Sequence, residues 1–202
     1  MKKTRLVVLA SGNGSNLQAV LEACESGRLN AEVAGVISDR QAAYALERAR
    51  NYHIPAEYHS WKPYREAGRT RLEYDADLAN KAASFKPDYI LLAGWMRLLS
   101  MPFLGCFPQR VINLHPALPG TFAGTHAIER AFTAFQKGEI EHTGVMVHFV
   151  PDEGVDDGPV IVQEVVPIRI NDTVEQLEER IHAVEHRLLV EALAHVFRKD
   201  NH

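Results

Sequence analysis

Short apolar runs alternate with longer amphipathic segments along most of the chain, a pattern typical of strands followed by helices. Strands are predicted at 5–10, 31–38, 56–59, 88–94, 110–114, 144–150 and 159–168. Helices are predicted from 17 to 27, 42 to 52, 72 to 87, 126 to 136 and 172 to about 197. This alternation predicts an α/β fold with a mostly parallel central sheet and helices on both faces. No linker or repeat divides the sequence, so we expect one domain over residues 1–202.

The last helix has the clearest pattern. Asp172-Thr173-Val174-Glu175 has the spacing of a capping box, which places Asp172 at the N-cap. Beyond it, apolar side chains recur at steps of three and four from Val174 to Leu188, which predicts one buried helix face.

The amino-acid composition and the net charge exclude several classes of protein. Of 202 residues, 46% are hydrophobic and 24% are charged, which is typical of a globular chain and excludes a disordered or fibrous one. A net charge of −4 does not favour nucleic acid or an anionic membrane as partner. The first apolar run, Leu6–Ala10, is too short for a signal peptide. We therefore expect a soluble, cytoplasmic protein.

The segment 11–16, Ser-Gly-Asn-Gly-Ser-Asn, joins the first predicted strand to the first helix. Its glycines permit a tight turn, and the helix N-terminus behind them suits a phosphate. Ser15 or Asn16 is expected to cap the helix. Leu17 stands where a dinucleotide fingerprint needs a third glycine, so a nicotinamide cofactor is disfavoured. A plain strand–helix turn is the alternative.

A second candidate site lies at the end of the strand 110–114. Alternation places Asn113 and His115 on one face, at the carboxyl end where ligands bind in such sheets. An amide N–H group stabilises a developing oxyanion by donating a hydrogen bond to it. An imidazole beside it exchanges a proton near neutral pH. A carboxylate from the acidic loop 152–158 would orient the imidazole and favour its charged form. Alternatively, both side chains are satisfied by the backbone at the strand end.

With these loops placed, the chain resembles the phosphoribosylglycinamide formyltransferase family over nearly its whole length. The resemblance is carried by five strings in order: Ser11-Gly12-Asn13-Gly14-Ser15-Asn16-Leu17, Leu92-Ala93-Gly94-Trp95-Met96-Arg97-Leu98-Leu99, Asn113-Leu114-His115-Pro116, Val147-His148-Phe149-Val150 and Asp156-Asp157-Gly158-Pro159-Val160-Ile161. It implies a Rossmann-like formyltransferase fold.

The resemblance also implies an activity and its residues. The formyl group of 10-formyltetrahydrofolate passes to the primary amine of glycinamide ribonucleotide through a tetrahedral intermediate, without a metal. Carried over by motif, the residues that hold the ribonucleotide are Gly14, Ser15, Asn16 and Glu185. Those that meet the folate are Arg71, Met96, Arg97, Leu98, Leu99 and Asn113. The catalytic residues are Asn113, His115 as proton donor, and Asp156, which raises the pKa of His115.

Further functions are compatible with parts of the sequence. Formyltetrahydrofolate hydrolase shares the donor and is the main alternative, although the phosphate loop favours a ribonucleotide acceptor over water. A folate-binding protein without catalysis would not need the three catalytic residues. His182-Ala183-Val184-Glu185-His186 matches an inverted zinc-peptidase motif, but no third ligand is evident downstream. A tRNA-binding formyltransferase would need a further basic domain. The chain is expected to be a monomer or a homodimer.

Overall fold

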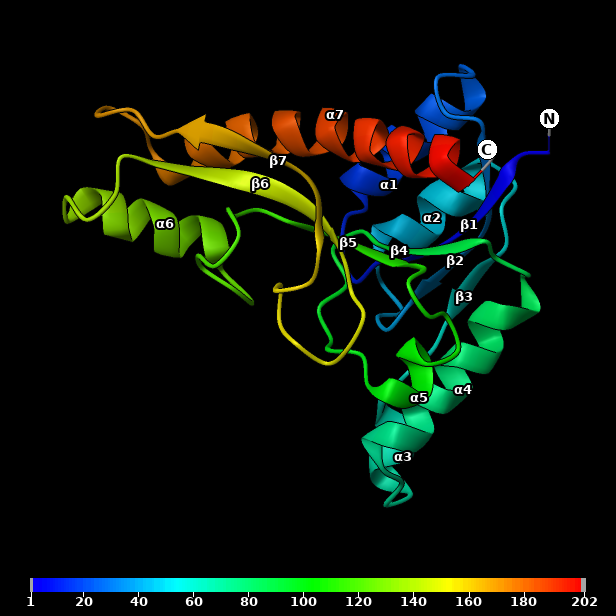
Figure 1. Ribbon diagram of the computed structural model, residues 1–202. Helices are drawn as coiled ribbons and strands as arrows, with labels where there is room; N and C mark the ends of the chain where they lie inside the picture. The colour runs from blue at the N-terminus through cyan, green and yellow to red at the C-terminus, as the bar shows by residue number, and fades with distance from the viewer. Residues whose placement is uncertain (1, 201–202) are drawn as a thin grey trace.

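In the computed structural model, which describes residues 2–200, seven strands form one sheet in the order β3-β2-β1-β4-β5-β6-β7 (Figure 1). The strands are β1 (Thr4–Leu9), β2 (Ala31–Ser38), β3 (Ala56–Tyr58), β4 (Tyr89–Leu92), β5 (Val111–His115), β6 (His142–Phe149) and β7 (Val160–Pro167). The first five run parallel, while β6 and β7 pair antiparallel to their neighbours. The predicted α/β fold with a mostly parallel sheet is confirmed.

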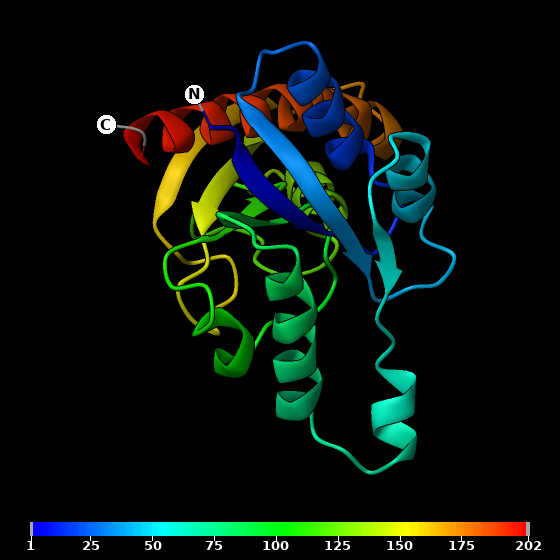
Figure 2. The same ribbon diagram turned by 90° about the vertical axis from the view of Figure 1, so that its right-hand side faces the viewer.

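Helices cover both faces of this sheet, as predicted (Figure 2). They are α1 (Ser15–Glu25), α2 (Tyr44–Asn51), α3 (Lys62–Glu66), α4 (Arg71–Ser84), α5 (Met101–Leu104), α6 (Ala127–Gln136) and α7 (Val174–Asp200). α1, α2 and α7 pack in one core, and α4 and α5 pack in the other. The sequence pattern does not predict α3 and α5, because each is too short for a helical repeat of apolar residues to emerge.

Strand β1 shows how one short sequence contributes to both cores. Leu6 and Val8 point into the core beneath α1 and α7, whereas Val7 and Leu9 point into the core beneath α4 and α5. All four side chains are fully buried. A strand covered on both faces reads as a continuous apolar run, which is how the sequence predicts it.

The strand order reverses between β1 and β4, since β2 and β3 lie on one side of β1 and β5 lies beyond β4. The loops that follow β1 and β4 therefore open away from each other and leave a crevice at the carboxyl edge of the sheet. The loop after β5 ends at the same edge. The two sequence-predicted sites thus meet at one place in the fold.

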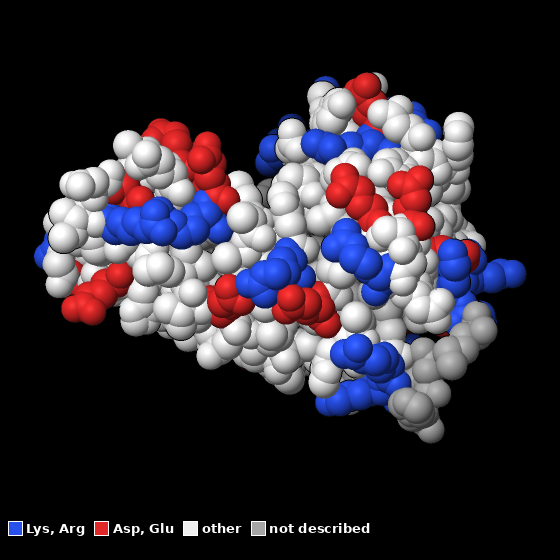
Figure 3. Space-filling model, turned by 90° about the horizontal axis from the view of Figure 1, so that it is seen from above, with Lys and Arg blue, Asp and Glu red and all other residues white. Residues whose placement is uncertain are grey.

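The surface over α7 carries charges of both signs. Figure 3 shows basic and acidic side chains next to one another on this face. Arg187, for example, pairs with Glu164 and Glu191. Among residues 2–200, no helix combines the length and the apolar character that crossing a membrane requires.

The start of α7 corrects the predicted cap. The Thr173 hydroxyl accepts a hydrogen bond from the Gln176 backbone N–H at 3.3 Å, and the Gln176 side chain accepts one from the Thr173 N–H at 3.0 Å. The capping box therefore begins at Thr173, one residue later than predicted. Asp172 instead binds both ends of the Arg180 guanidinium at 2.7 Å. Both residues are good N-caps, so spacing alone did not separate them.

Asp172→Asn is expected to lower the free energy of unfolding at pH 7 by about 1–2 kcal/mol, the size of a charge-assisted hydrogen-bond pair. The hydrogen bonds from Arg180 lower the pKa of Asp172 from 3.8 to about 2. A lowered pKa stabilises the fold above the unfolded value, and this stabilisation is lost as the pH falls from about 4 to 2. Urea unfolding at pH 7 and pH 2.5 measures the difference, which should shrink at the lower pH. An equal difference at both values would contradict this account.

Candidate functional site

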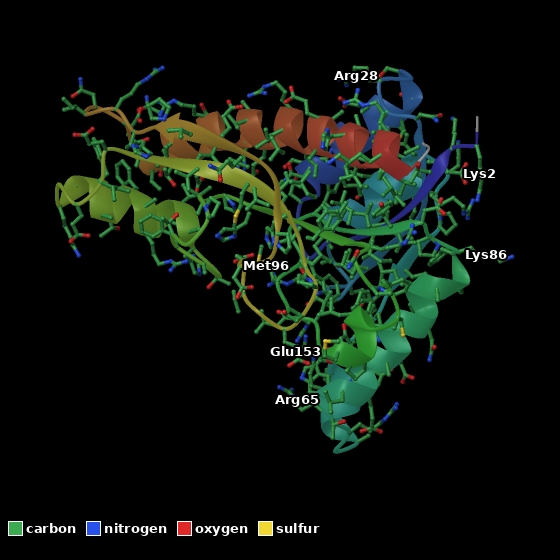
Figure 4. All side chains as sticks on the ribbon, in the orientation of Figure 1. Lys2, Arg28, Arg65, Lys86, Met96 and Glu153 are labelled. Atoms are coloured by element: carbon green, nitrogen blue, oxygen red, sulfur yellow. The ribbon has the colours of Figure 1, made fainter. Side chains whose placement is uncertain are left out.

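A cavity of about 960 Å³ lies at the carboxyl edge of the sheet, where the loops after β1, β4 and β5 meet. Eleven of the twelve residues predicted for the site line it: Gly14, Ser15, Asn16, Met96, Arg97, Leu98, Leu99, Asn113, His115, Asp156 and Glu185. Its outer rim includes the loop between β6 and β7. Figure 4 places Glu153 of that loop beside α5, where its carboxylate accepts a hydrogen bond from the Met101 N–H at 2.8 Å.

Asp156 is the centre of the polar cluster in this cavity. Its Oδ2 lies 3.2 Å from His115 Nδ1 and accepts a hydrogen bond from the Gly124 N–H at 2.8 Å. Its Oδ1 accepts a hydrogen bond from Asn113 Nδ2 at 2.9 Å and lies 3.5 Å from His148 Nε2. One carboxylate therefore contacts groups from β5, β6 and the loop before α6. It joins the two polar residues that the sequence places at the end of β5.

His115 has an acceptor at each ring nitrogen. Nδ1 faces Asp156, and Nε2 lies 3.1 Å from the backbone carbonyl oxygen of Phe122. A protonated imidazole satisfies both acceptors, so the contacts favour the charged form. Burial acts in the opposite direction, lowering the pKa of His115 below 6.5, and the Asp156 charge raises it only part of the way back. Asp156 thus acts on the pKa of His115 in the predicted direction, while burial lowers that pKa by more than the Asp156 charge raises it.

The Asp156 carboxylate stays ionised at neutral pH. Burial by itself would raise its pKa, but the hydrogen bonds from His148 and the Gly124 N–H, together with the nearby His115, hold the pKa of Asp156 below its usual value. Its backbone has φ of 54°, in the left-handed region that costs a non-glycine residue free energy. A strained residue of this kind is common at functional sites.

His148 belongs to a string that resembles the family, yet sequence reasoning assigned it no role. It is 1% exposed and pairs with Asn113 in the β5–β6 register. Its Nδ1 lies 2.9 Å from the Phe149 carbonyl oxygen, which only accepts, so Nδ1 carries a proton. Its Nε2 lies 3.2 Å from Asn113 Nδ2 and 3.5 Å from Asp156 Oδ1. Side chains alternate between the two faces of β6, and this alternation places His148 on the same face as Asn113 only when the antiparallel register of β5 and β6 is known.

The loop after β1 presents a helix N-terminus to the same cavity. Gly14 is the N-cap of α1 with φ of 77°, and no described side chain caps the helix. The expected cap by Ser15 or Asn16 is therefore wrong. Because the first turn of α1 also holds no acidic residue, its end keeps the partial positive charge that attracts an anion.

Two neighbouring helices brace this loop. Arg48 of α2 donates hydrogen bonds to the backbone and side-chain oxygens of Asn13, each at 2.9 Å. Glu185 of α7 accepts a hydrogen bond from Asn16 Nδ2 at 3.3 Å. The Asn16 side-chain oxygen is buried and has no hydrogen-bond partner among the described residues. An unsatisfied oxygen at this position is available to a donor group on a ligand.

Comparison with known proteins decides between the remaining interpretations. The family model described as "Formyl transferase" matches residues 4–193. This chain belongs to the formyl transferase family. It is 50% identical to the phosphoribosylglycinamide formyltransferase of Schizosaccharomyces pombe, over 97% of this chain and 98% of that one. The predicted family resemblance is confirmed.

Solved structures of formyl transferases agree with this assignment. The chain is similar to a glycinamide ribonucleotide transformylase of Symbiobacterium toebii, with a TM-score of 0.88 and 43% identity over 96% of this chain and 87% of that chain. It is also similar to the phosphoribosylglycinamide formyltransferase of Bacillus halodurans, with a TM-score of 0.89 and 36% identity over 98% of this chain and 97% of that chain. The hydrolase alternative is not favoured by these relatives.

Arg71 is the predicted site residue that does not line the formyl transferase cavity. It lies on α4, where its Nε donates a hydrogen bond to Asp75 at 3.0 Å. Arg97 does line the cavity, and its Nε donates a hydrogen bond to the buried Asp39 at 2.7 Å. Met96 and Leu98 of the same loop are more than half exposed. These apolar side chains are open to a flat, apolar ligand.

The segment that matches the inverted zinc-peptidase motif, residues 182–186, holds a hydrogen-bonded pair of its own residues, His182 and Glu185. His182 Nδ1 lies 2.7 Å from Glu185, and this hydrogen bond raises the pKa of His182 above 6.5. Among residues 2–200, no group of three or more His, Cys, Asp or Glu side chains is placed to hold a metal ion. Glu185 instead joins α7 to the first turn of α1 through Asn16.

Proposed function

We propose that this formyl transferase moves the formyl group of 10-formyltetrahydrofolate to the primary amine of glycinamide ribonucleotide in purine biosynthesis. The products are formylglycinamide ribonucleotide and tetrahydrofolate. Relatives named phosphoribosylglycinamide formyltransferase support the proposal. The observation that carries it is that one cavity is lined both by the uncapped N-terminus of α1 and by Asp156 with its partners Asn113, His115 and His148, which form the Asp156 cluster.

The chemistry assigned to the cluster is stabilisation of charge on the formyl oxygen. A C–N bond forms as the amine attacks the formyl carbon, and the bond from that carbon to N10 of the folate breaks. The proton lost by the amine balances the proton gained by N10. Between these events the formyl oxygen carries negative charge, which Asn113 and His115 meet as donors.

His115 Nε2 is assigned as the proton donor, because Nδ1 is held by Asp156. His115 Nε2 lies 3.1 Å from the Phe122 carbonyl oxygen. That carbonyl must give way to the formyl oxygen for transfer to occur. Arg130 donates hydrogen bonds to the Phe122 and Ala123 carbonyls at 2.5 and 2.7 Å, which leaves Phe122 a partner after the exchange.

The two substrates are assigned to different parts of the cavity lining. Gly14, Ser15 and Asn16 hold the phosphate of the ribonucleotide, and Glu185 also contacts the ribonucleotide. Met96, Arg97, Leu98 and Leu99 meet the folate, and Arg71 approaches it from α4. We further propose a single formyltransferase domain over 1–202, a monomeric or homodimeric state, a cytoplasmic location, and no nucleic-acid partner.

An assay of the purified protein separates transfer from hydrolysis. Tetrahydrofolate formation from 10-formyltetrahydrofolate is followed with and without glycinamide ribonucleotide. Turnover that requires the acceptor and yields formylated product supports the proposal. Equal turnover without the acceptor would instead identify a hydrolase.

Gly14→Ala is expected to raise the KM for the ribonucleotide by about tenfold or more, because an added side chain displaces the backbone N–H groups assigned to the phosphate. A Cβ at Gly14 would also lie 2.8 Å from the Ala45 side chain, which forces the loop to move. The KM for the folate should change little.

Gly27→Ala is the matched control for this variant. Gly27 has nearly the same φ, 74°, but an added Cβ meets nothing within 4 Å and the residue lies at the far end of α1. Steady-state kinetics with each substrate varied in turn measures both variants. If Gly14→Ala changes both KM values equally, or if Gly27→Ala reproduces its effect, the phosphate assignment fails.

A further inference from the structure

The loop Gly94–Ser100 has no helical or strand structure of its own, and its residues Gly94 to Leu99 line the cavity. Its last residue, Ser100, is held by a side chain from another element. Asp75 Oδ2 accepts a hydrogen bond from the Ser100 backbone N–H at 2.9 Å and another from its hydroxyl at 2.6 Å. These contacts fix the point at which the loop enters α5.

Asp75 is fully buried and does not line the cavity. Its second oxygen accepts the hydrogen bond from Arg71 Nε, so one carboxylate holds both the loop end and the arginine. A buried carboxylate is stable only when such donors compensate for its lost hydration. Arg71 Nη2 is buried and has no hydrogen-bond partner among the described residues, so part of this guanidinium remains available to an acceptor.

The other end of the loop is fixed as well. The Ser11 N–H donates to the Gly94 carbonyl oxygen, and the Ser11 hydroxyl accepts from the Met96 N–H, both at 2.9 Å. Between the two ends, Arg97 is bound to Asp39. A loop fixed at both ends and in its middle loses little conformational freedom when a ligand binds, which strengthens binding.

We propose that Asp75 is a positioning residue for the formyl-folate donor, which acts through Ser100 and Arg71 to set donor affinity. The inference rests on the proposed function, because it takes the loop Gly94–Ser100 to be the donor-binding wall. Asp75 touches no substrate. Its removal therefore changes how well the donor is held and leaves the Asp156 cluster as it is.

Asp75→Asn tests this inference with almost no change in side-chain volume. The amide replaces one acceptor oxygen with a donor, which cannot serve both Ser100 and Arg71. The KM for 10-formyltetrahydrofolate should rise about tenfold, as expected when a charge-assisted hydrogen bond is lost. The ribonucleotide KM and kcat should stay within about twofold of the parent.

Asp77→Asn is the control on the same helix. Asp77 pairs with Tyr64 and Arg69 and has no contact with the loop, so this variant should keep the parent's donor KM. Ser100→Ala removes the hydroxyl but keeps the backbone N–H, and a rise of about threefold in donor KM is expected. The double variant of Asp75→Asn and Ser100→Ala should match Asp75→Asn alone, because both act through one contact.

Unchanged donor KM in Asp75→Asn, or equal loss in kcat and both KM values, would overturn the inference. If Asp75→Asn fails to fold, Ser100→Ala tests the inference in its place, and an unchanged donor KM in that variant would overturn it. Binding of tetrahydrofolate, measured by calorimetry, is the readout that does not require turnover. A parent protein that binds tetrahydrofolate but transfers no formyl group would refute the proposed function. The ratio of tetrahydrofolate affinities would still decide the role of Asp75.

Discussion

His115→Ala is expected to reduce kcat by at least about 10²–10³-fold, the cost of removing a donor from a developing oxyanion. Asn113→Ala should lose activity of the same order. The KM values should change little, because both donors strengthen their contact mainly as charge builds on the formyl oxygen. Steady-state kinetics with both substrates varied measures the two effects separately.

Exposed residues of the same types provide controls for these variants. His142→Ala, at the start of β6, and Asn80→Ala, on α4, should keep the parent's kcat. A large increase in either substrate KM with kcat unchanged would assign His115 and Asn113 to binding. It would contradict their assignment to the formyl oxygen.

Asp156→Asn is expected to lower kcat by about 10²-fold or more, because the carboxylate orients both donors and also supplies charge. It accepts hydrogen bonds from Asn113 and the Gly124 N–H as well as facing His115. The neighbouring Asp157→Asn is the matched control. Asp157 is exposed and does not line the cavity, so its variant should keep the parent's activity.

The pH dependence of Asp156→Asn should shift in a predictable direction. Burial lowers the pKa of His115, and the Asp156 charge opposes that effect. Removing the charge lowers the pKa of His115 further, so the protonated donor is lost at lower pH. A plot of kcat against pH from 5 to 9 should show its basic limb moved toward acid. A limb at the parent's position would mean that Asp156 does not act on His115 by charge.

Local patterns in the sequence were sufficient to predict the sheet and part of the site. The apolar run of β1 predicts a strand buried on both faces, and Leu6 to Leu9 are indeed divided between two cores. Alternation at the end of β5 predicts that Asn113 and His115 share one face. Both line the cavity and contact Asp156. In each case, successive side chains of a strand point to opposite faces of the sheet, so the sequence itself indicates which side chains share a face.

Features that depend on contacts between distant segments could not be predicted in the same way. His148 reaches Asn113 through an antiparallel register that no local pattern specifies. Arg71 points to Asp75 rather than lining the cavity, which depends on how α4 packs beside Ser100. The lowered pKa of His115 follows from burial, which sequence reasoning did not weigh against the charge of Asp156.

In the proposed formyl transfer, Asp156 and His115 work as one unit. A double-mutant cycle of kcat with His115→Ala, Asp156→Asn and both together tests it most directly. Asp156 also holds Asn113, so the double variant should be somewhat worse than His115→Ala. The combined loss should still fall short of the product of the two single losses by at least about tenfold, since the carboxylate no longer has an imidazole to orient. Losses that simply multiply would contradict the account.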